Sequence, residues 1–277
     1  MSQSLSRQSE ENPQAPGFLV AVTRVEALVV FTAVAVLFLA PVKGGSDIWA
    51  WITPPYNARY IAAIYLAALL PLIMFAVSTR WSPGHLVVWM ILTFTGSIMI
   101  VMLGYPDRFE WERLSTWGFW VLYLFLPFNA AYWLWRLREL RVPGRVAATA
   151  PWRWALTGLA LALGAYGVAL LAVPEDVTDF WPWPVDAFHA RIYAATFLAA
   201  AVGTWLLRAG GSKGEYQTMA GTLLGLGIAS IVAVVLTSSN APDAVKVDYD
   251  ASGTWGFFAL NAAVALAGAA LITRARE

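Results

Sequence analysis

The chain has 277 residues, of which 59% are hydrophobic and 13% are charged, whereas soluble domains average about 45–50% apolar and about 25% charged residues. A net charge of +1 provides no basic field for nucleic acid, and the lack of cysteine excludes disulfides, iron–sulfur clusters, zinc–cysteine sites and thiol chemistry. Two histidines, His85 and His189, are too few for a buried two-haem cytochrome. These exclusions leave an all-α integral membrane protein.

Eight stretches are apolar over the roughly 20 residues that a helix needs to cross a bilayer. The segment before them, residues 1–23, is polar, lacks the pattern of a secretion signal and is expected to be a disordered cytoplasmic tail. Thr23 and Glu26 have the spacing of a capping box, which predicts that the first helix begins beside them. The eight expected transmembrane helices are residues 24–42, 57–79, 84–104, 115–135, 154–173, 188–208, 217–237 and 254–273.

Basic residues concentrate on one side of these predicted spans. Of the 18 Lys and Arg, 12 lie in the segments that include both ends of the chain, and 11 of the 17 acidic residues lie on the opposite side. Cytoplasmic loops retain Lys and Arg. We therefore expect a protein of the plasma (cytoplasmic) membrane with both termini in the cytoplasm.

Two pairs of similar segments indicate an internal duplication. Residues 47–70 match residues 179–202 at ten of 24 positions, and residues 116–139 and 254–277 both begin Thr-Trp-Gly-Phe and end Arg-x-Arg-Glu. The sequence therefore predicts two tandem four-helix repeats of the same orientation, related by a parallel pseudo-twofold axis along the membrane normal. The expected units are a first repeat at 24–139, a basic cytoplasmic linker at 140–153 and a second repeat at 154–277.

The most specific local pattern is Asp-x-Trp-x-Trp followed by Arg twelve residues after the Asp, once at the outer end of each repeat. Indoles are typical of membrane interfaces, and an Arg at a helix start can pair with a carboxylate. We interpret the pattern as a structural anchor in which each Asp pairs with the Arg of its own copy. The alternative is an outer vestibule whose indoles stack on a sugar, a lipid head group or a cation. The residues are Asp47, Trp49, Trp51 and Arg59 in one copy and Asp179, Trp181, Trp183 and Arg191 in the other.

His189 aligns with Asn57 and lies near the same outer rim. A helical zinc site would need a second ligand one turn away, and His189 has no such histidine. We expect it to form hydrogen bonds, and we expect neither a metal nor a cofactor in this protein.

The predicted spans carry no ionisable residue that stands out as central, where such a group would mark proton or ion coupling. The intramembrane candidates are the neutral residues Tyr123, Asn129 and Asn261, and the repeat places Tyr123 opposite Asn261. Such side chains usually bond to neighbouring helices or to backbone carbonyls. Gly221 and Gly225 form a G-x-x-x-G pair that predicts close packing of the seventh helix.

The chain contains no phosphate-binding loop, dinucleotide fingerprint, metalloprotease motif or nucleophile elbow, so an enzyme is not expected. We predict a non-enzymatic structural, accessory or sensor protein whose outer rim contacts lipid or a membrane protein partner, which includes a second copy of the chain. The alternative is a permease-like carrier that moves a neutral or weakly polar solute through the seam between the repeats. An enzyme that acts on a lipid-linked substrate at the outer rim is the third hypothesis.

Overall fold

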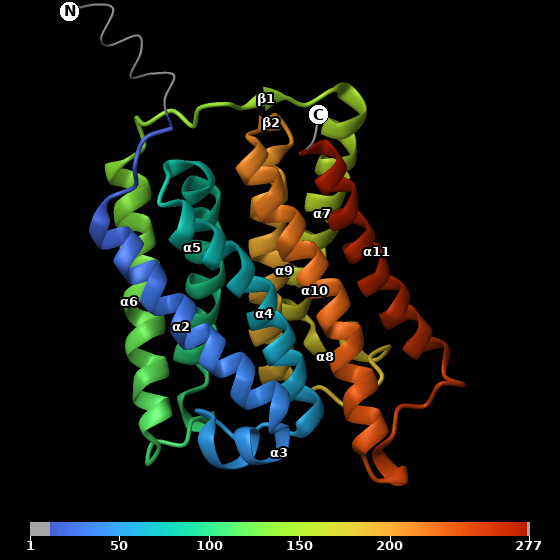
Figure 1. Ribbon diagram of the computed structural model, residues 1–277. Coiled ribbons are helices and arrows are strands. Elements are labelled where there is room, and N and C mark those ends of the chain that lie inside the picture. The colour runs from blue at the N-terminus through green and yellow to red at the C-terminus, as the bar shows by residue number, and fades with distance from the viewer. Residues whose placement is uncertain (1–11, 276–277) are drawn as a thin grey trace, which may run out of the picture.

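The computed structural model describes residues 12–275 as a bundle of helices. Both ends of the described chain lie at the same end of the bundle (Figure 1), which we call the terminal end, and the opposite end is called the loop end. The long helices are α2 (Gly17–Leu39), α4 (Pro55–Ser78), α5 (Trp81–Gly104), α6 (Leu114–Arg136), α7 (Ala150–Ala172), α9 (Ala187–Leu207), α10 (Lys213–Asn240) and α11 (Ser252–Arg274).

Within this part of the chain, seven of the long helices are long and apolar enough to cross a membrane. They are apolar on their outward faces too, as Leu28, Leu161 and Leu266 illustrate with exposed side chains. A helix that is hydrophobic on all sides is typical of a bilayer. The structure therefore indicates a multi-pass membrane protein. The remaining long helix, α6, is rich in Trp and Tyr and falls outside this set.

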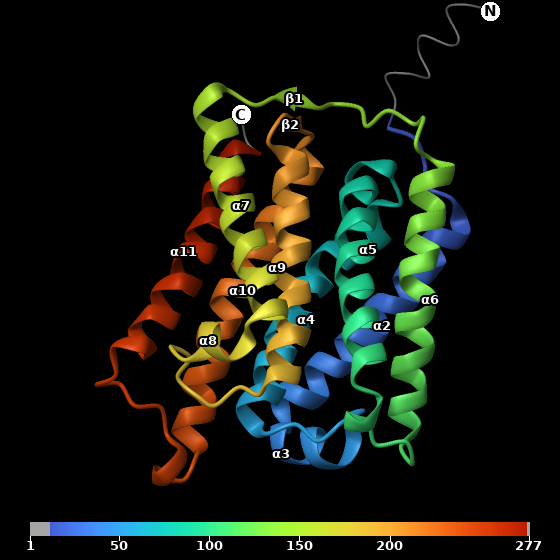
Figure 2. The ribbon, with the colours of Figure 1, turned by 180° about the vertical axis from the view of Figure 1, so that it is seen from behind.

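Helices α4, α5, α9 and α10 form the centre of the bundle. α4 packs against α2 and α10, and α9 packs against α7 and α5. α6 then covers α5, and α11 covers α10, so that α2 and α6 flank one side while α7 and α11 flank the other (Figures 1 and 2). The side chains at the centre are fully buried aromatic residues, among them Trp51, Tyr60 and Tyr193.

Two of the long helices, α9 and α10, begin at capping side chains. Ser212 caps α10 by accepting a hydrogen bond from the Glu215 amide, and the Glu215 carboxylate accepts one from the Ser212 amide. This is a capping box, which satisfies two amides that the helix leaves unpaired. Asp186 caps α9 by accepting from the His189 amide. The sequence analysis did not identify either cap.

The capping box predicted at Thr23 and Glu26 is wrong. α2 begins at Gly17, and the Thr23 hydroxyl donates to the Leu19 carbonyl within the helix. Glu26 therefore lies nine residues, or about 14 Å, inside α2. The start of the expected tail, residues 1–11, lies outside the described residues.

Short backbone pairings close the terminal end. The Ala15 amide donates to the Thr79 carbonyl over 2.9 Å, which ties the chain before α2 to the turn after α4. Strand β1 (Val146–Ala147), in the connection from α6 to α7, pairs antiparallel with β2 (Gly210–Gly211) in the turn before α10. At the loop end, the short helices α3 (Pro41–Lys43) and α8 (Pro174–Thr178) follow α2 and α7.

Glycines allow α10 to approach its neighbours closely, as the sequence predicted. A Cβ at Gly225 would lie 3.2 Å from the Ala67 Cα in α4. A Cβ at Gly227 would collide with the Asn261 carbonyl oxygen and lie 2.7 Å from the Ala265 nitrogen, both in α11. Close packing by small residues is a main source of helix association in membranes.

Replacement of Gly227 with Ala should therefore destabilise the fold by about 1–3 kcal/mol, the usual cost of overpacking. The added methyl group forces the α10 and α11 backbones apart. SDS titration in mixed micelles measures the free energy of unfolding. Gly158→Ala in α7 is the control, because nothing lies within 4 Å of its added Cβ. Equal losses in the two variants would contradict the tight α10–α11 contact.

Candidate functional site

The tryptophans of the Asp-x-Trp-x-Trp pattern turn into the bundle at the loop end. Trp51 Nε1 donates to His189 Nε2 over 3.1 Å, and Trp183 Nε1 donates to Asn57 Oδ1 over 2.6 Å. Trp51 precedes α4 and bonds to the first turn of α9, whereas Trp183 precedes α9 and bonds to the first turn of α4. These four side chains are buried. The two indoles thus link α4 and α9 reciprocally, and Trp183 also lines a cavity at the loop end with Trp181 and Asp179.

His189 uses both ring nitrogens in hydrogen bonds. Nδ1 lies 3.0 Å from Asp186 Oδ2, and Nε2 accepts the Trp51 N–H while the Thr53 hydroxyl lies 3.3 Å from it. This arrangement suits a neutral imidazole with its proton on Nδ1. It agrees with the expected hydrogen-bonding role.

Asp186 orients this histidine and also pairs with Arg108 over 2.8 Å. Burial alone would raise the pKa of the Asp186 carboxyl, but the hydrogen bonds from His189 and the charge of Arg108 outweigh it, so the pKa is lowered well below its ordinary value. The carboxylate therefore stays charged across the neutral range.

The ion pairs expected within each pattern do not form among the described residues. Arg59 donates to the Phe38 carbonyl over 3.1 Å, and Arg191 donates to the Leu171 carbonyl over 2.9 Å. Each guanidinium thereby caps the last turn of a neighbouring helix, where carbonyls lack helical partners and a positive charge is favoured. The expected carboxylate partners, Asp47 and Asp179, are exposed.

The two remaining tryptophans of the pattern differ. Trp181 is buried, and its indole donates to the Tyr166 hydroxyl over 2.8 Å. The indole nitrogen of Trp49 is also buried, but it has no hydrogen-bond partner among the described residues. Trp49 lines a cavity.

This cavity has a volume of about 520 Å³, within the range of small-molecule sites. Its walls come from α2, α4, α5 and α6, with α9 and a single residue of α10 behind them. Leu28 of α2 and Gly118 of α6 both line it and are both exposed, so the cavity opens on the side of the bundle between these helices. The lining is almost entirely aliphatic and aromatic.

Of the three intramembrane candidates, Tyr123 is part of this cavity. Its hydroxyl pairs with that of Tyr65 at 2.8 Å, and both residues line the wall. Asn261 donates to the Phe257 carbonyl of its own helix, and Asn129 accepts from Trp133 Nε1. Neither asparagine lines the cavity.

Glu26 is the residue of the site that the sequence analysis missed. Its side chain lines the cavity, it is 8% exposed, and it forms no hydrogen bond or ion pair with the described residues. The available signal was the apolar run that begins at Phe18, well before Thr23. That run places Glu26 inside a span rather than at its start.

Further unpaired polar atoms lie around the same space. Trp49 Nε1, Ser115 Oγ and Thr196 Oγ1 are buried without a hydrogen-bond partner in the described chain, and all three residues line the cavity. Buried polar groups normally have partners. The three residues that carry these atoms lie together in the cavity wall.

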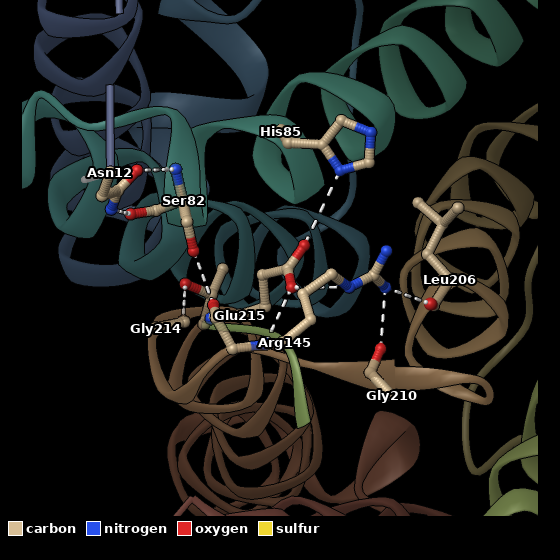
Figure 3. Close-up of polar contacts among 10 residues, drawn as sticks. Asn12, Ser82, His85, Arg145, Leu206, Gly210, Gly214 and Glu215 are labelled. Atoms are coloured by element: carbon tan, nitrogen blue, oxygen red, sulfur yellow. Dashed lines mark hydrogen bonds and ion pairs between the residues drawn. The ribbon is translucent and has the colours of Figure 1, made fainter. Parts of the chain in front are cut away.

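The polar residues at the terminal end are instead bonded to one another (Figure 3). The Glu215 carboxylate lies 3.4 Å from Arg145 Nε and 3.6 Å from His85 Nδ1. The Arg145 guanidinium also donates to the Leu206 and Gly210 carbonyls. This network ties the connection after α6 to the starts of α5 and α10, and we interpret it as structural.

Comparison with known proteins finds no matching family model, and no curated protein or solved structure matches the chain. Any function must therefore be argued from the geometry of the cavity.

Replacement of Asp186 with Asn should lower stability in a pH-dependent way. Because the folded-state pKa of Asp186 is depressed, its carboxylate stabilises the fold above its ordinary pKa of 3.8, and this stabilisation is lost as the pH falls towards the folded-state value. The difference in thermal midpoint between wild type and variant should thus be full above about pH 5 and shrink below about pH 4. Asp179→Asn, which removes an exposed carboxylate, should show no such trend. If the midpoint difference from wild type depends on pH in the same way for both variants, the role of Asp186 is refuted.

Proposed function

We propose that this protein is a non-enzymatic membrane protein that binds a lipophilic small molecule in the cavity between α2 and α6, in a sensor or accessory role. The observation that carries the proposal is the apolar cavity of about 520 Å³ with unpaired polar atoms in its wall. Apolar walls favour an apolar occupant, and a few polar groups orient it.

The occupant reaches the cavity from the bilayer. The mouth of the cavity lies on the side of the bundle, between α2 and α6. The outward faces of these helices carry exposed apolar residues such as Leu28 and Val121. At the loop end, by contrast, Trp51, Phe109 and Phe119 form a buried aromatic cluster. Entry from lipid is therefore favoured over entry from water.

The carrier alternative, with a pathway through the seam between α4 and α9, is less well supported. Buried side chains occupy the loop end of this seam: the Tyr60 and Trp183 rings lie 5.4 Å apart and the Tyr60 and Tyr193 rings 4.7 Å apart. A solute would have to displace these rings and break the Trp–His and Trp–Asn hydrogen bonds.

The bilayer remains the proposed environment of the outer aromatic face of α6. A protein partner or a second copy of the chain is the other candidate.

The proposal includes eight membrane spans arranged as two tandem repeats. The spans are the seven apolar helices and α6. α6 is 23 residues long and packs against α5. Matched contacts support the repeat. Trp117 Nε1 donates to the Trp111 carbonyl over 3.1 Å, and Trp255 Nε1 donates to the Tyr249 carbonyl over 2.9 Å. The excess of Lys and Arg at the terminal end supports a cytoplasmic location of both termini in the plasma membrane.

Single cysteines test this topology, since the native chain has none. Glu112→Cys precedes α6 and Arg141→Cys follows it, and both positions are exposed. We expect a membrane-impermeant maleimide to label Glu112→Cys in intact cells and Arg141→Cys only after permeabilisation. Labelling of both from the same side would show that α6 does not cross, and the reverse pattern would show the opposite orientation.

A bulky side chain in the cavity should abolish binding. Ala68 lines the cavity and is partly exposed to it, so Ala68→Phe fills the space. Dodecanol, as the probe, should raise the thermal midpoint of the wild type in a saturable way, because a ligand that binds the folded state stabilises it. We expect no saturable rise in Ala68→Phe.

The matched control is Ala162→Phe, which places the same side chain on an exposed position of α7. It should respond to dodecanol as the wild type does. If all three proteins respond alike, the probe acts as a solvent rather than as a ligand of the cavity, and the proposed function fails.

A further inference from the structure

We propose that the ligand is a cationic amphiphile whose amine binds the Glu26 carboxylate, with its hydrocarbon chain along the cavity. This inference rests on the proposed function and specifies the chemistry of the molecule that the cavity binds. It starts from one observation: Glu26, a residue more than nine-tenths buried, lines an apolar cavity, and its carboxyl group has no protein partner within the described residues.

The charges around the cavity favour a cation. Among residues 12–275, Glu26 is the one ionisable residue of the lining apart from the tyrosine pair Tyr65 and Tyr123, and no Lys, Arg or His of this range contributes to the wall. The nearest arginine in sequence, Arg24, donates instead to the Ala76 carbonyl over 3.2–3.3 Å. Nothing in the lining would stabilise a phosphate or a carboxylate, and Glu26 would repel either.

An amine also resolves the cost of burying Glu26. An isolated carboxylate in apolar surroundings is very unfavourable, and pairing with an opposite charge relieves most of that cost. The proton balance closes by either route. A free amine that enters from the bilayer takes the proton of a neutral Glu26 carboxyl, and an ammonium ion that enters releases that proton to water. Both routes end in the same charge-assisted hydrogen bond between ammonium and carboxylate.

The shape of the cavity fits a chain attached to that amine. Along α2 the lining runs from Glu26 to Val36, a rise of about 15 Å in a helix. Ile64 and Phe94 continue the apolar wall, and Trp49 closes the far end near the loop end of the bundle. The amine therefore lies at the end nearer the terminal side, and the chain extends towards Trp49.

The test compares dodecylamine with dodecanol and dodecanoic acid, which share one chain and differ in the head group. Affinity is read at pH 7 from the saturable rise in thermal midpoint in detergent micelles. For the wild type we expect dodecylamine to bind about tenfold or more tightly than dodecanol, and dodecanoic acid to bind most weakly, because a hydrogen bond between charged partners is stronger than one to a neutral head group.

Glu26→Gln keeps the size of the side chain and removes its charge. It should lose about tenfold or more in dodecylamine affinity and retain the wild-type affinity for dodecanol, which also shows that the variant folds with its cavity intact. Glu175→Gln, which removes an exposed carboxylate near α8, should change neither affinity and so controls for general attraction of the amine.

The failures are distinguishable. If Glu26→Gln binds the amine as the wild type does, or loses both ligands equally, the amine assignment is overturned while the cavity stands as a site for a neutral molecule. Preference of the wild type for dodecanol or dodecanoic acid overturns it as well. If no probe binds saturably and Ala68→Phe behaves as the wild type does, the proposed function itself fails.

Discussion

Two indole hydrogen bonds at the loop end, together with the packing of α4 on α10 and of α5 on α9, determine how the halves of the bundle meet. In apolar surroundings an unpaired polar group is costly, so Asn57 and His189 require donors, and Trp183 and Trp51 supply them from the other half. These bonds set the position of α4 against α9. The flanking helices follow, since α4 carries α2 and α10, and α9 carries α7 and α5. Arg59 of α4 then donates to the Phe38 carbonyl in the last turn of α2.

The same requirement separates the structural polar residues from those available to a ligand. At the terminal end, Glu215 has Arg145, His85 and the Ser212 amide as neighbours, and it is as deeply buried as any residue of the core. Glu26 is also buried, but it has no hydrogen-bond or ion-pair partner in the described part of the chain. Two buried carboxylates therefore have different roles. Glu215 is paired and contributes to the fold, whereas Glu26 lines a cavity that can admit a partner.

The positions of long helices were predictable because each apolar run carries its own signal, and the expected bounds lie within a few residues of α4, α5 and α6. The start of α2 was not predictable, because the spacing of Thr23 and Glu26 fits a capping box at a helix start and equally fits the interior of a longer helix. Partners of side chains were also beyond the sequence. The pattern placed Asp47 in a loop and Arg59 at the start of the next helix, where the two could pair. A carbonyl of α2 competes with Asp47 for the guanidinium, and only the packing of α2 against α4 decides between them. The cavity arises between helices that are distant in sequence, so it has no local signature.

The proposed repeat explains why the walls of this cavity come mainly from helices of the first half. When the offsets of the matched segments are carried along the chain, polar or bulky residues of the first half pair with smaller or apolar residues of the second. The aligned pairs are Glu26 with Gly158, Tyr65 with Phe197, Thr95 with Gly227 and Tyr123 with Asn261. The consequences are physical. Gly227 lets α11 approach α10, and Asn261 turns back to bond its own helix. Gly167 similarly brings α7 against α9, because a Cβ there would lie 2.8 Å from Leu198 Cγ. The second half thus packs closely and supports the fold, while the first keeps open a lined space with a carboxyl group. Divergence between the copies of the proposed repeat is sufficient to produce the proposed division between support and binding.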